Sequence, residues 1–123
     1  MLAHKHLVVR AEVDKPIVNK NKAIKFLRSL IKKIKMKPMY GPTASYCKMV
    51  GNRGITAFAI IETSHIAMHI WDESSPALVQ LDVYSCSDFD PKTVFEHIKP
   101  MNPTHIDYNF LDREEKFIEV LAN

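Results

Sequence analysis

The sequence predicts an α+β protein, a two-layer α/β sandwich in which helices cover one face of a mostly antiparallel sheet. Several segments alternate between apolar and polar residues, which is typical of strands with one buried face. Two segments repeat apolar residues at helical spacing, and Gly- and Pro-rich turns separate the elements. Elements with one apolar face bury it against a second layer. The expected order is β-α-β-β-β-α-β within a single domain, residues 1–123.

A strand and a long helix open this order. Every second residue of His6–Val13 is apolar, so one face of this strand should be buried. The segment NKNKAIKFLRSLIKKIKM, residues 19–36, places lysines opposite an apolar stripe and therefore predicts a helix. Pro38, Gly41 and Pro42 oppose helix and end it. The stripe consists of Ala23, Phe26, Leu27, Leu30, Ile31 and Ile34.

Strands follow in the middle of the chain. Thr43–Val50 and Ile55–Ile61 flank the turn sequence GNRG, which favours a hairpin. His65–Trp71 alternates strictly, so its histidines and Trp71 should lie on one face and its isoleucines and methionine on the other. Ala77–Cys86 is the next predicted strand. Its polar face should carry Gln80, Asp82, Tyr84 and Cys86.

The last elements are a second helix and a strand. Asp90 is a suitable N-cap, and Pro91 suits the first position of the helix. The apolar stripe of this helix is Val94, Phe95 and Ile98, and two prolines close it. Thr104–Phe110 is a strand with Ile106, Tyr108 and Phe110 on one side. The tail DREEKFIEVLA is expected to form either a short helix or a frayed end.

Charge is spread unevenly along the chain. Residues 1–53 carry 13 Lys and Arg against 2 acids, whereas residues 54–123 carry 4 against 12. A basic half can indicate nucleic-acid binding. A lysine-rich, solvated helix face is the favoured interpretation, because no aromatic residues interleave with the lysines as a stacking surface requires. The two halves could also complement each other, within a protomer or across a dimer.

Cysteine content and hydropathy predict a cytoplasmic location. Cys47 and Cys86 have no partner at short spacing, so each is expected to be a free thiol in a reducing compartment. No apolar run resembles a signal peptide or is long enough to span a membrane. We therefore expect a cytoplasmic protein without a membrane partner.

The stretch ETSHIAMHIWDE is the most unusual part of the sequence. On a helix, His65 and His69 could share one zinc ion, but four strand steps separate them by roughly 13 Å, so no metal is expected. Ser64 lacks the glycines of a G-x-S-x-G elbow, although a triad assembled from distant residues stays open. The plainest interpretation is two half-buried strand histidines and a turn serine.

Several motifs together carry a resemblance to a known family. SHIAMHIWDE (Ser64–Glu73), followed by LDVYSCSDFDP (Leu81–Pro91), resembles the signature of short, prokaryotic-type S-adenosylmethionine decarboxylases. HLV (His6–Val8) and FEHIK (Phe95–Lys99) extend the resemblance, which covers roughly Lys5–Asp107. The Ser, His, Trp, Glu and Cys combination is specific, and the terminal motifs are weak. The order of elements in that family agrees with the predicted one.

The resemblance implies self-processing. Members of the family are made as inactive proenzymes (zymogens) that cleave themselves autocatalytically. The matching break here is between Thr63 and Ser64, which gives a β chain, 1–63, and an α chain, 64–123. Ser64 then becomes a pyruvoyl group, the covalently attached cofactor, and no metal takes part.

Each residue type that processing needs is present at a matching position. Ser64 would attack the Thr63 carbonyl and convert the amide to an ester. By resemblance, Thr56 would support the oxyanion of that step. His69 matches the processing base that takes the Ser64 Cα proton, for which a neutral imidazole near pH 7 is suitable.

The resemblance also implies a reaction and a partner. The mature protein would be a carboxy-lyase that binds S-adenosylmethionine as a Schiff base on the pyruvoyl group and releases carbon dioxide. Cys86 matches the proton donor, and Glu73 and Trp71 match substrate-binding residues. The product would serve polyamine (spermidine) biosynthesis. A homodimer is expected, with the site near the protomer interface and no nucleic acid as partner.

Some positions depart from the pattern of the family and leave other functions open. Thr63 stands where relatives have glutamate, and Asp72 stands where most have proline. The position that usually stacks on adenine is Val50 by count, and Tyr46 is the nearest upstream aromatic residue. The same apparatus could therefore decarboxylate ornithine or arginine. An unprocessed regulatory or structural homologue, or a basic-helix module that binds RNA, are the remaining alternatives.

Overall fold

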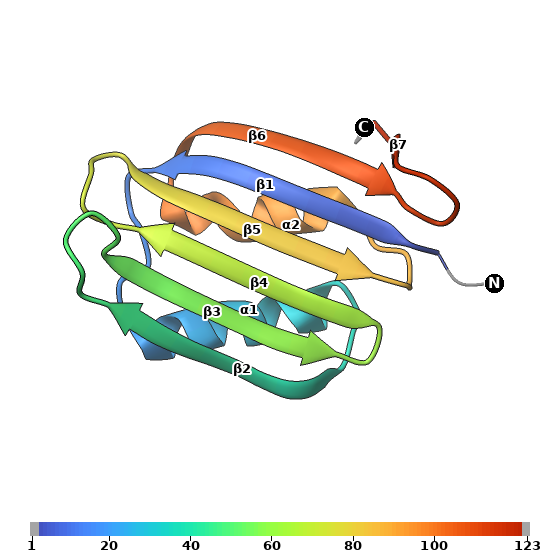
Figure 1. Cartoon of the computed structure of the whole chain (residues 1–123), viewed down its shortest axis with the longest axis horizontal. Helices are drawn as coiled ribbons and strands as arrows, with labels where there is room; N and C mark the ends of the chain where they lie inside the picture. Colours follow the sequence, from blue (N-terminus) through green and yellow to red (C-terminus); the bar gives the residue numbers. More distant parts are fainter. Residues whose placement is uncertain (1–2, 122–123) are drawn as a thin grey trace.

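One antiparallel sheet with two helices on one face makes up residues 3–121, the part of the chain that the computed structural model describes (Figure 1). The strands lie in the order β2-β3-β4-β5-β1-β6-β7, and each neighbouring pair is antiparallel. The predicted α+β sandwich is therefore confirmed. The elements are β1 (Lys5–Val13), α1 (Lys20–Lys33), β2 (Pro38–Cys47), β3 (Gly54–Ile61), β4 (Ser64–Trp71), β5 (Ala77–Ser85), α2 (Pro91–Ile98), η1 (Lys99–Met101), β6 (Pro103–Asp112) and β7 (Ile118–Glu119).

The predicted order has one strand too few between the helices. Four strands, β2 to β5, connect α1 to α2, whereas the expected order contains three. The fourth strand is β5, which lies between β4 and β1 and so joins the β2–β3–β4 meander to the rest of the sheet. All four correspond to segments whose residue pattern predicts a strand, so the error concerns the order and not the segments.

The two ends of the sheet differ from the expectations. β2 begins at Pro38 and ends at Cys47, whereas the predicted strand covers Thr43–Val50. Prolines fit here because β2 is an edge strand, where an N–H is not needed on the outer side. The tail forms neither of its two expected structures, because Ile118–Glu119 pairs with β6 as the short strand β7.

Both helices begin at side-chain caps. The Asn19 side chain accepts a hydrogen bond from the Lys22 N–H and caps α1, and Asp90 caps α2 in the same way through Lys92. Pro91 occupies the first turn of α2, as predicted. Within residues 3–121, neither helix has the length and apolar character needed to cross a membrane.

The core lies between the helices and the strand faces that alternation predicts. Ile66, Met68 and Ile70 of β4 are buried against the helices, while His65 and His69 point to the other side. We call that other side the open face, because no helix covers it; it is the face toward the viewer in Figure 1. The helices contribute Ala23, Leu27, Leu30, Ile31, Val94 and Ile98 to the core.

A buried histidine connects the two helices. His97 of α2 is 9% exposed and donates from Nε2 to the Phe26 carbonyl at 2.8 Å, while its Nδ1 accepts from Lys33 Nζ at 3.1 Å. Burial lowers the pKa of His97 below its ordinary value, and the charge of Lys33 lowers it further, although the Phe26 carbonyl opposes this shift. The fold therefore requires the neutral imidazole.

Stability is expected to fall as the pH drops below about 6.5, the unfolded pKa of histidine, through the lower pKa of folded His97. The unfolded chain binds the proton more readily than the folded chain in this window, so acid favours unfolding. His97→Gln keeps a donor for Phe26 but cannot titrate. The loss of melting temperature between pH 7.5 and pH 5 should therefore be smaller in this variant by a few degrees. Equal losses in both proteins would contradict this assignment.

Candidate active site

The predicted site residues form two groups at opposite ends of β4. Ser64 is the first residue of this strand and Trp71 is the last, so their Cα atoms lie about 23 Å apart at a strand rise of about 3.3 Å per residue. We name the group at the β3–β4 turn the processing end and the group at the β4–β5 loop the pocket end. Thr63, Ser64 and Cys86 belong to the processing end, and Thr56, His69, Trp71 and Glu73 belong to the pocket end.

At the processing end, the carbonyl of the predicted cleavage bond is held by a backbone amide. Thr63 and Glu62 form the tight turn between β3 and β4. The Thr63 carbonyl oxygen accepts a hydrogen bond from the Cys86 N–H at 2.8 Å. An N–H in this position polarises the carbonyl and stabilises negative charge on its oxygen. Sequence reasoning missed this donor, since a backbone group leaves no signal in the sequence.

The backbone of Ser64 turns its side chain toward the preceding carbonyl carbon. Ser64 has φ 152°, which residues other than glycine rarely adopt. The Cβ of an L-residue is rotated by about 120° from its carbonyl carbon about the N–Cα bond, so the torsion from the Thr63 carbonyl carbon to Ser64 Cβ is about 30°. At the strand φ of about −120° this torsion would be about 120°. Only a small torsion lets Oγ close a five-membered ring on the carbonyl carbon.

The Thr63 side chain is also fixed. Ser85 Oγ donates to Thr63 Oγ1 at 2.9 Å, and Thr63 Oγ1 in turn donates to Met36 Sδ at 3.2 Å. Ser85 itself accepts from the Ser87 N–H at 3.0 Å and is fully buried. Alternation predicts that Ser85 lies on the buried face of β5, but nothing in the sequence indicates its contact with Thr63.

At the pocket end, Thr56 and His69 form a pair. They are register partners on β3 and β4, and Thr56 Oγ1 lies 3.1 Å from His69 Nδ1. The His69 ring also stacks on Trp71, with ring centroids 5.7 Å apart. His69 lies five strand steps, about 16 Å, from Ser64. Thr56 and His69 are therefore together, but neither reaches the Thr63–Ser64 bond of the same chain.

The predicted substrate-binding residues, Glu73 and Trp71, form hydrogen bonds to the β2–β3 hairpin at the pocket end. Glu73 Oε1 accepts from the Gly51 N–H at 2.7 Å and from the Arg53 N–H at 3.0 Å. Trp71 Nε1 donates to Asn52 Oδ1 at 2.8 Å. Both residues thus tie the β4–β5 loop to the β2–β3 hairpin. A hollow next to them is lined by Cys47, Asn52, Gly54, Ile55, Thr56, His69, Ile70 and Trp71.

Asp72 makes a third tie between these loops. It accepts from the Tyr46 hydroxyl at 2.6 Å and from Arg53 Nε at 2.7 Å. Burial alone would raise the pKa of the Asp72 carboxyl, but the hydrogen bonds from Tyr46 and Arg53 hold it below its ordinary value. Tyr46 packs against the core, whereas Val50 is 90% exposed on the hairpin. The two residues considered for stacking on adenine, Tyr46 and Val50, therefore lie in different environments.

A polar cluster on the open face flanks Cys86, which is a half-buried free thiol. Arg113 Nη1 lies 3.0 Å from His6 Nδ1, and its guanidinium lies 4.5 Å from the centre of the Tyr84 ring. Because Arg113 can only donate, His6 accepts at Nδ1 and presents its Nε2–H to Asp82. Sequence reasoning placed Asp82 and Tyr84 on this face but missed Arg113, which comes from the C-terminal segment.

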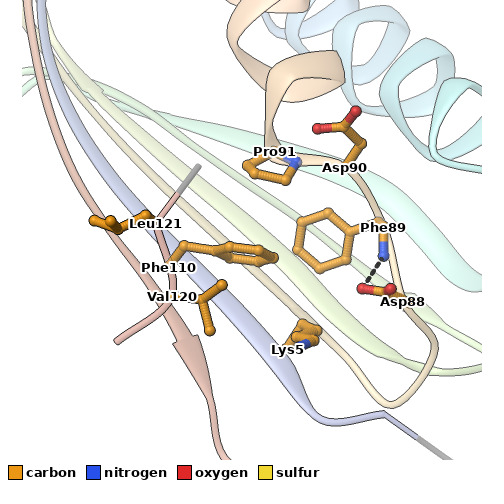
Figure 2. A pocket seen from close by; sticks show the side chains of 8 residues that line it. All are labelled: Lys5, Asp88, Phe89, Asp90, Pro91, Phe110, Val120 and Leu121. Carbon is orange, nitrogen blue, oxygen red and sulfur yellow. Dashed lines mark hydrogen bonds between the residues drawn. The ribbon is translucent and has the colours of Figure 1, made fainter. Parts of the chain in front are cut away.

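A separate hollow of about 530 Å³ lies beside the start of α2 (Figure 2). The rings of Phe89 and Phe110 meet in it edge to face, 5.6 Å apart. Asp88 and Asp90 stand at its rim, and both use a carboxylate oxygen to cap backbone N–H groups. None of the predicted site residues lines this hollow.

The fold is shared with a solved structure. The crystal structure of the adenosylmethionine decarboxylase from Aquifex aeolicus VF5 matches with a TM-score of 0.66 and 23% identity, covering 99% of this chain and 98% of that one. Fold and site together thus define the class of protein. It is a two-layer α+β protein in which a strand begins at Ser64 and the Cys86 N–H binds the carbonyl that precedes this serine.

The family follows from the sequence comparison. The model of the S-adenosylmethionine decarboxylase family matches residues 5–114, and the chain belongs to this family.

Two curated relatives are similar over part of the chain. The S-adenosylmethionine decarboxylase proenzyme of Pyrobaculum islandicum is 44% identical over 64 residues, which is 50% of this chain and 50% of that protein. The proenzyme of Pyrobaculum arsenaticum is 42% identical over 64 residues, with the same shares. The match therefore spans about half the length of the curated relatives.

Proposed function

We propose that this protein cleaves itself between Thr63 and Ser64 and then decarboxylates S-adenosylmethionine as a pyruvoyl-dependent carboxy-lyase. The observation that carries this proposal is the backbone of Ser64, whose φ of 152° turns the side chain toward a carbonyl that the Cys86 N–H polarises. Membership of the S-adenosylmethionine decarboxylase family and the similarity to proenzymes support it independently. The product would serve polyamine (spermidine) synthesis in the cytoplasm.

Processing consists of three chemical steps. The Ser64 Oγ bonds to the Thr63 carbonyl carbon, the C–N bond breaks, and the hydroxyl proton passes to the nitrogen, which gives an ester. The His69 imidazole then takes the Ser64 Cα proton, so the Thr63 carboxylate leaves and dehydroalanine forms. Water converts this residue to the pyruvoyl group and ammonia. The Cys86 N–H would stabilise the oxyanion of the first step through its hydrogen bond to the Thr63 carbonyl oxygen.

A homodimer would complete the site. His69 and Thr56 cannot reach Ser64 of their own chain, because about 16 Å of strand separates them. In a two-fold dimer that pairs the open faces, the pocket end of one protomer can meet the processing end of its partner. Exposed apolar residues on this face favour such a contact: Tyr40 is 59%, Phe58 41% and Ile60 44% exposed. We therefore propose two composite sites per dimer.

The residues present fit the pyruvoyl group at position 64. When formed, this group supplies an electrophilic carbonyl that binds the substrate amine and withdraws electrons from the bond to the carboxylate. Cys86, whose N–H contacts the Thr63 carbonyl, would return a proton from its thiol to the substrate carbon. At the pocket end, the second oxygen of Glu73 is free of the loop amides and could accept from ribose hydroxyls, with Trp71 as the neighbouring aromatic surface.

Intact-mass measurement tests the proposal directly. Purified protein should consist of two fragments divided between Thr63 and Ser64, the second without an amino terminus. Release of carbon dioxide should then be measured with S-adenosylmethionine, ornithine and arginine in turn. A single chain after long incubation would favour an unprocessed homologue, and release only from ornithine or arginine would replace the proposed substrate.

Cys86→Ala is expected to cleave normally but to lose about 10²-fold or more in kcat. Cleavage uses the backbone N–H of residue 86, which alanine retains, whereas proton return uses the thiol. Fragment masses and carbon dioxide release on the same sample separate the two steps. Normal fragment masses are the control within the same sample, because they show that the variant folds and processes itself. Normal turnover by Cys86→Ala would remove the thiol from the mechanism.

A further inference from the structure

We infer that the hydroxyl groups of Thr63 and Ser85 position the cleavage bond for the first step of processing. Both are positioning residues, because they act on the orientation of the Thr63 carbonyl and not on the reacting atoms. The inference rests on the proposed function and adds two residues to it. It gives Thr63, which stands where relatives have glutamate, a role of its own.

Four groups form a directed chain of hydrogen bonds around Thr63. The Ser87 N–H donates to Ser85 Oγ at 3.0 Å, Ser85 Oγ donates to Thr63 Oγ1 at 2.9 Å, and Thr63 Oγ1 donates to Met36 Sδ at 3.2 Å. Each hydroxyl has one proton, so the chain uses every donor once. The shorter of the two contacts of Ser85 Oγ is the one to Thr63, and these bonds favour one orientation of the Thr63 side chain.

This chain of hydrogen bonds anchors the turn to β5 and to the segment that follows α1. Ser85 ends β5 and is fully buried, and Met36, which follows α1, is 9% exposed. A buried hydroxyl that loses its hydrogen-bond partner destabilises the fold, so this arrangement resists rotation. The Thr63 side chain is held between β5 and the segment after α1, while the Thr63 carbonyl is held by the Cys86 N–H from the same strand end.

Holding both the side chain and the carbonyl of Thr63 fixes the peptide plane. The unusual φ of Ser64 strains the backbone, and a free turn would relieve this strain by rotating the Thr63–Ser64 peptide. Such a rotation would move the carbonyl carbon away from Ser64 Oγ and its oxygen away from the Cys86 N–H. Displacement of the attacked carbonyl by about 1 Å can cost about 10²-fold in rate.

The test isolates the first step with His69→Ala, which lacks the base of the second step. In this background the ester should accumulate, and hydroxylamine should cleave it to an α chain that begins with an ordinary serine. We expect hydroxylamine cleavage to be at least about tenfold slower in Thr63→Val/His69→Ala and in Ser85→Ala/His69→Ala than in His69→Ala alone. Thr63→Ser/His69→Ala retains the hydroxyl and should restore the rate. Fragment masses over time provide the measurement.

Thr104→Val/His69→Ala is the matched control, because it removes an exposed threonine hydroxyl on β6. Its rate should equal that of His69→Ala. Thr63→Val should keep its fold, since Ser85 Oγ can turn to Met36 Sδ, 3.7 Å away. Melting temperatures check this, and a Thr63→Ser chain that folds but stays slow would overturn the inference.

The outcomes separate this inference from the proposed function. Cleavage of Thr63→Val/His69→Ala as fast as that of His69→Ala overturns the positioning role and leaves self-processing intact. Absence of cleavage in the wild-type chain, together with absence of hydroxylamine cleavage in His69→Ala, overturns both.

Discussion

Replacing Ser64 by alanine is expected to leave every chain whole and to abolish decarboxylation. The variant lacks the only oxygen that the Ser64 backbone turns toward the Thr63 carbonyl carbon, so no ester can form. It also lacks the atoms from which the pyruvoyl group is made. The effect should therefore be complete, beyond the loss that a weakened general base produces, which is about 10²- to 10⁴-fold. Intact mass after days at working temperature, together with carbon dioxide release, provides the measurement.

Ser29→Ala is the control for this variant. Ser29 lies on the exposed side of α1, so the same change of atoms there should leave cleavage and turnover unchanged. Melting temperatures should be similar for both variants, because neither side chain carries a hydrogen bond that the fold depends on. If Ser64→Ala still yields two fragments divided between residues 63 and 64, serine-dependent processing is wrong.

The second large effect concerns the dimer. Ser64→Ala and His69→Ala chains should each stay whole when expressed alone, but co-expression should restore cleavage of the His69→Ala chain. In a mixed dimer this chain keeps Ser64 and faces a partner that keeps His69, so one composite site is intact. About half of the His69→Ala chains can be cleaved if two-fold dimers form at random. Different affinity tags identify the cleaved chain by mass.

This result depends on the separation of the two groups along β4. If His69 acted on Ser64 of its own chain, the mixed dimer would contain no complete site and every chain would stay whole. Cleavage of the His69→Ala chain expressed alone would instead exclude His69 as the processing base. A change that introduces a charge on the open face, Phe58→Asp, should prevent mixed dimers and with them the restored cleavage, because it buries a carboxylate in the proposed contact.

The sequence alone predicted which side chains of a strand share a face. The two faces of β4 and β5 agree with the predicted ones, because the side-chain period of a strand is two regardless of its neighbours. The Asp90 cap and the helix stripes are equally local. The start of β2 at Pro38 was missed because tolerance of proline depends on an edge position, which only the strand order establishes.

The candidate site also has one part that the sequence predicts and one part that only the fold establishes. The residue types for processing and decarboxylation, from Thr56 to Cys86, can be chosen from the sequence because their motif spacing is characteristic. Which of them lie together is a property of the sheet. Strand register pairs Thr56 with His69. It also brings Ser85 and Cys86 to Thr63, although 22 residues of sequence separate Ser85 from Thr63.

The sequence by itself determined the local preferences of this protein: the period of each strand, the stripe of each helix and the presence of a serine preceded by a threonine at the chain's midpoint. Only the tertiary structure decided that this serine has a positive φ, that a backbone N–H holds the carbonyl before it, and that its predicted base lies at the far end of the same strand. The reason is physical: backbone torsions in a turn, and contacts between residues far apart in sequence, are fixed by the packing of whole strands, which no single segment encodes.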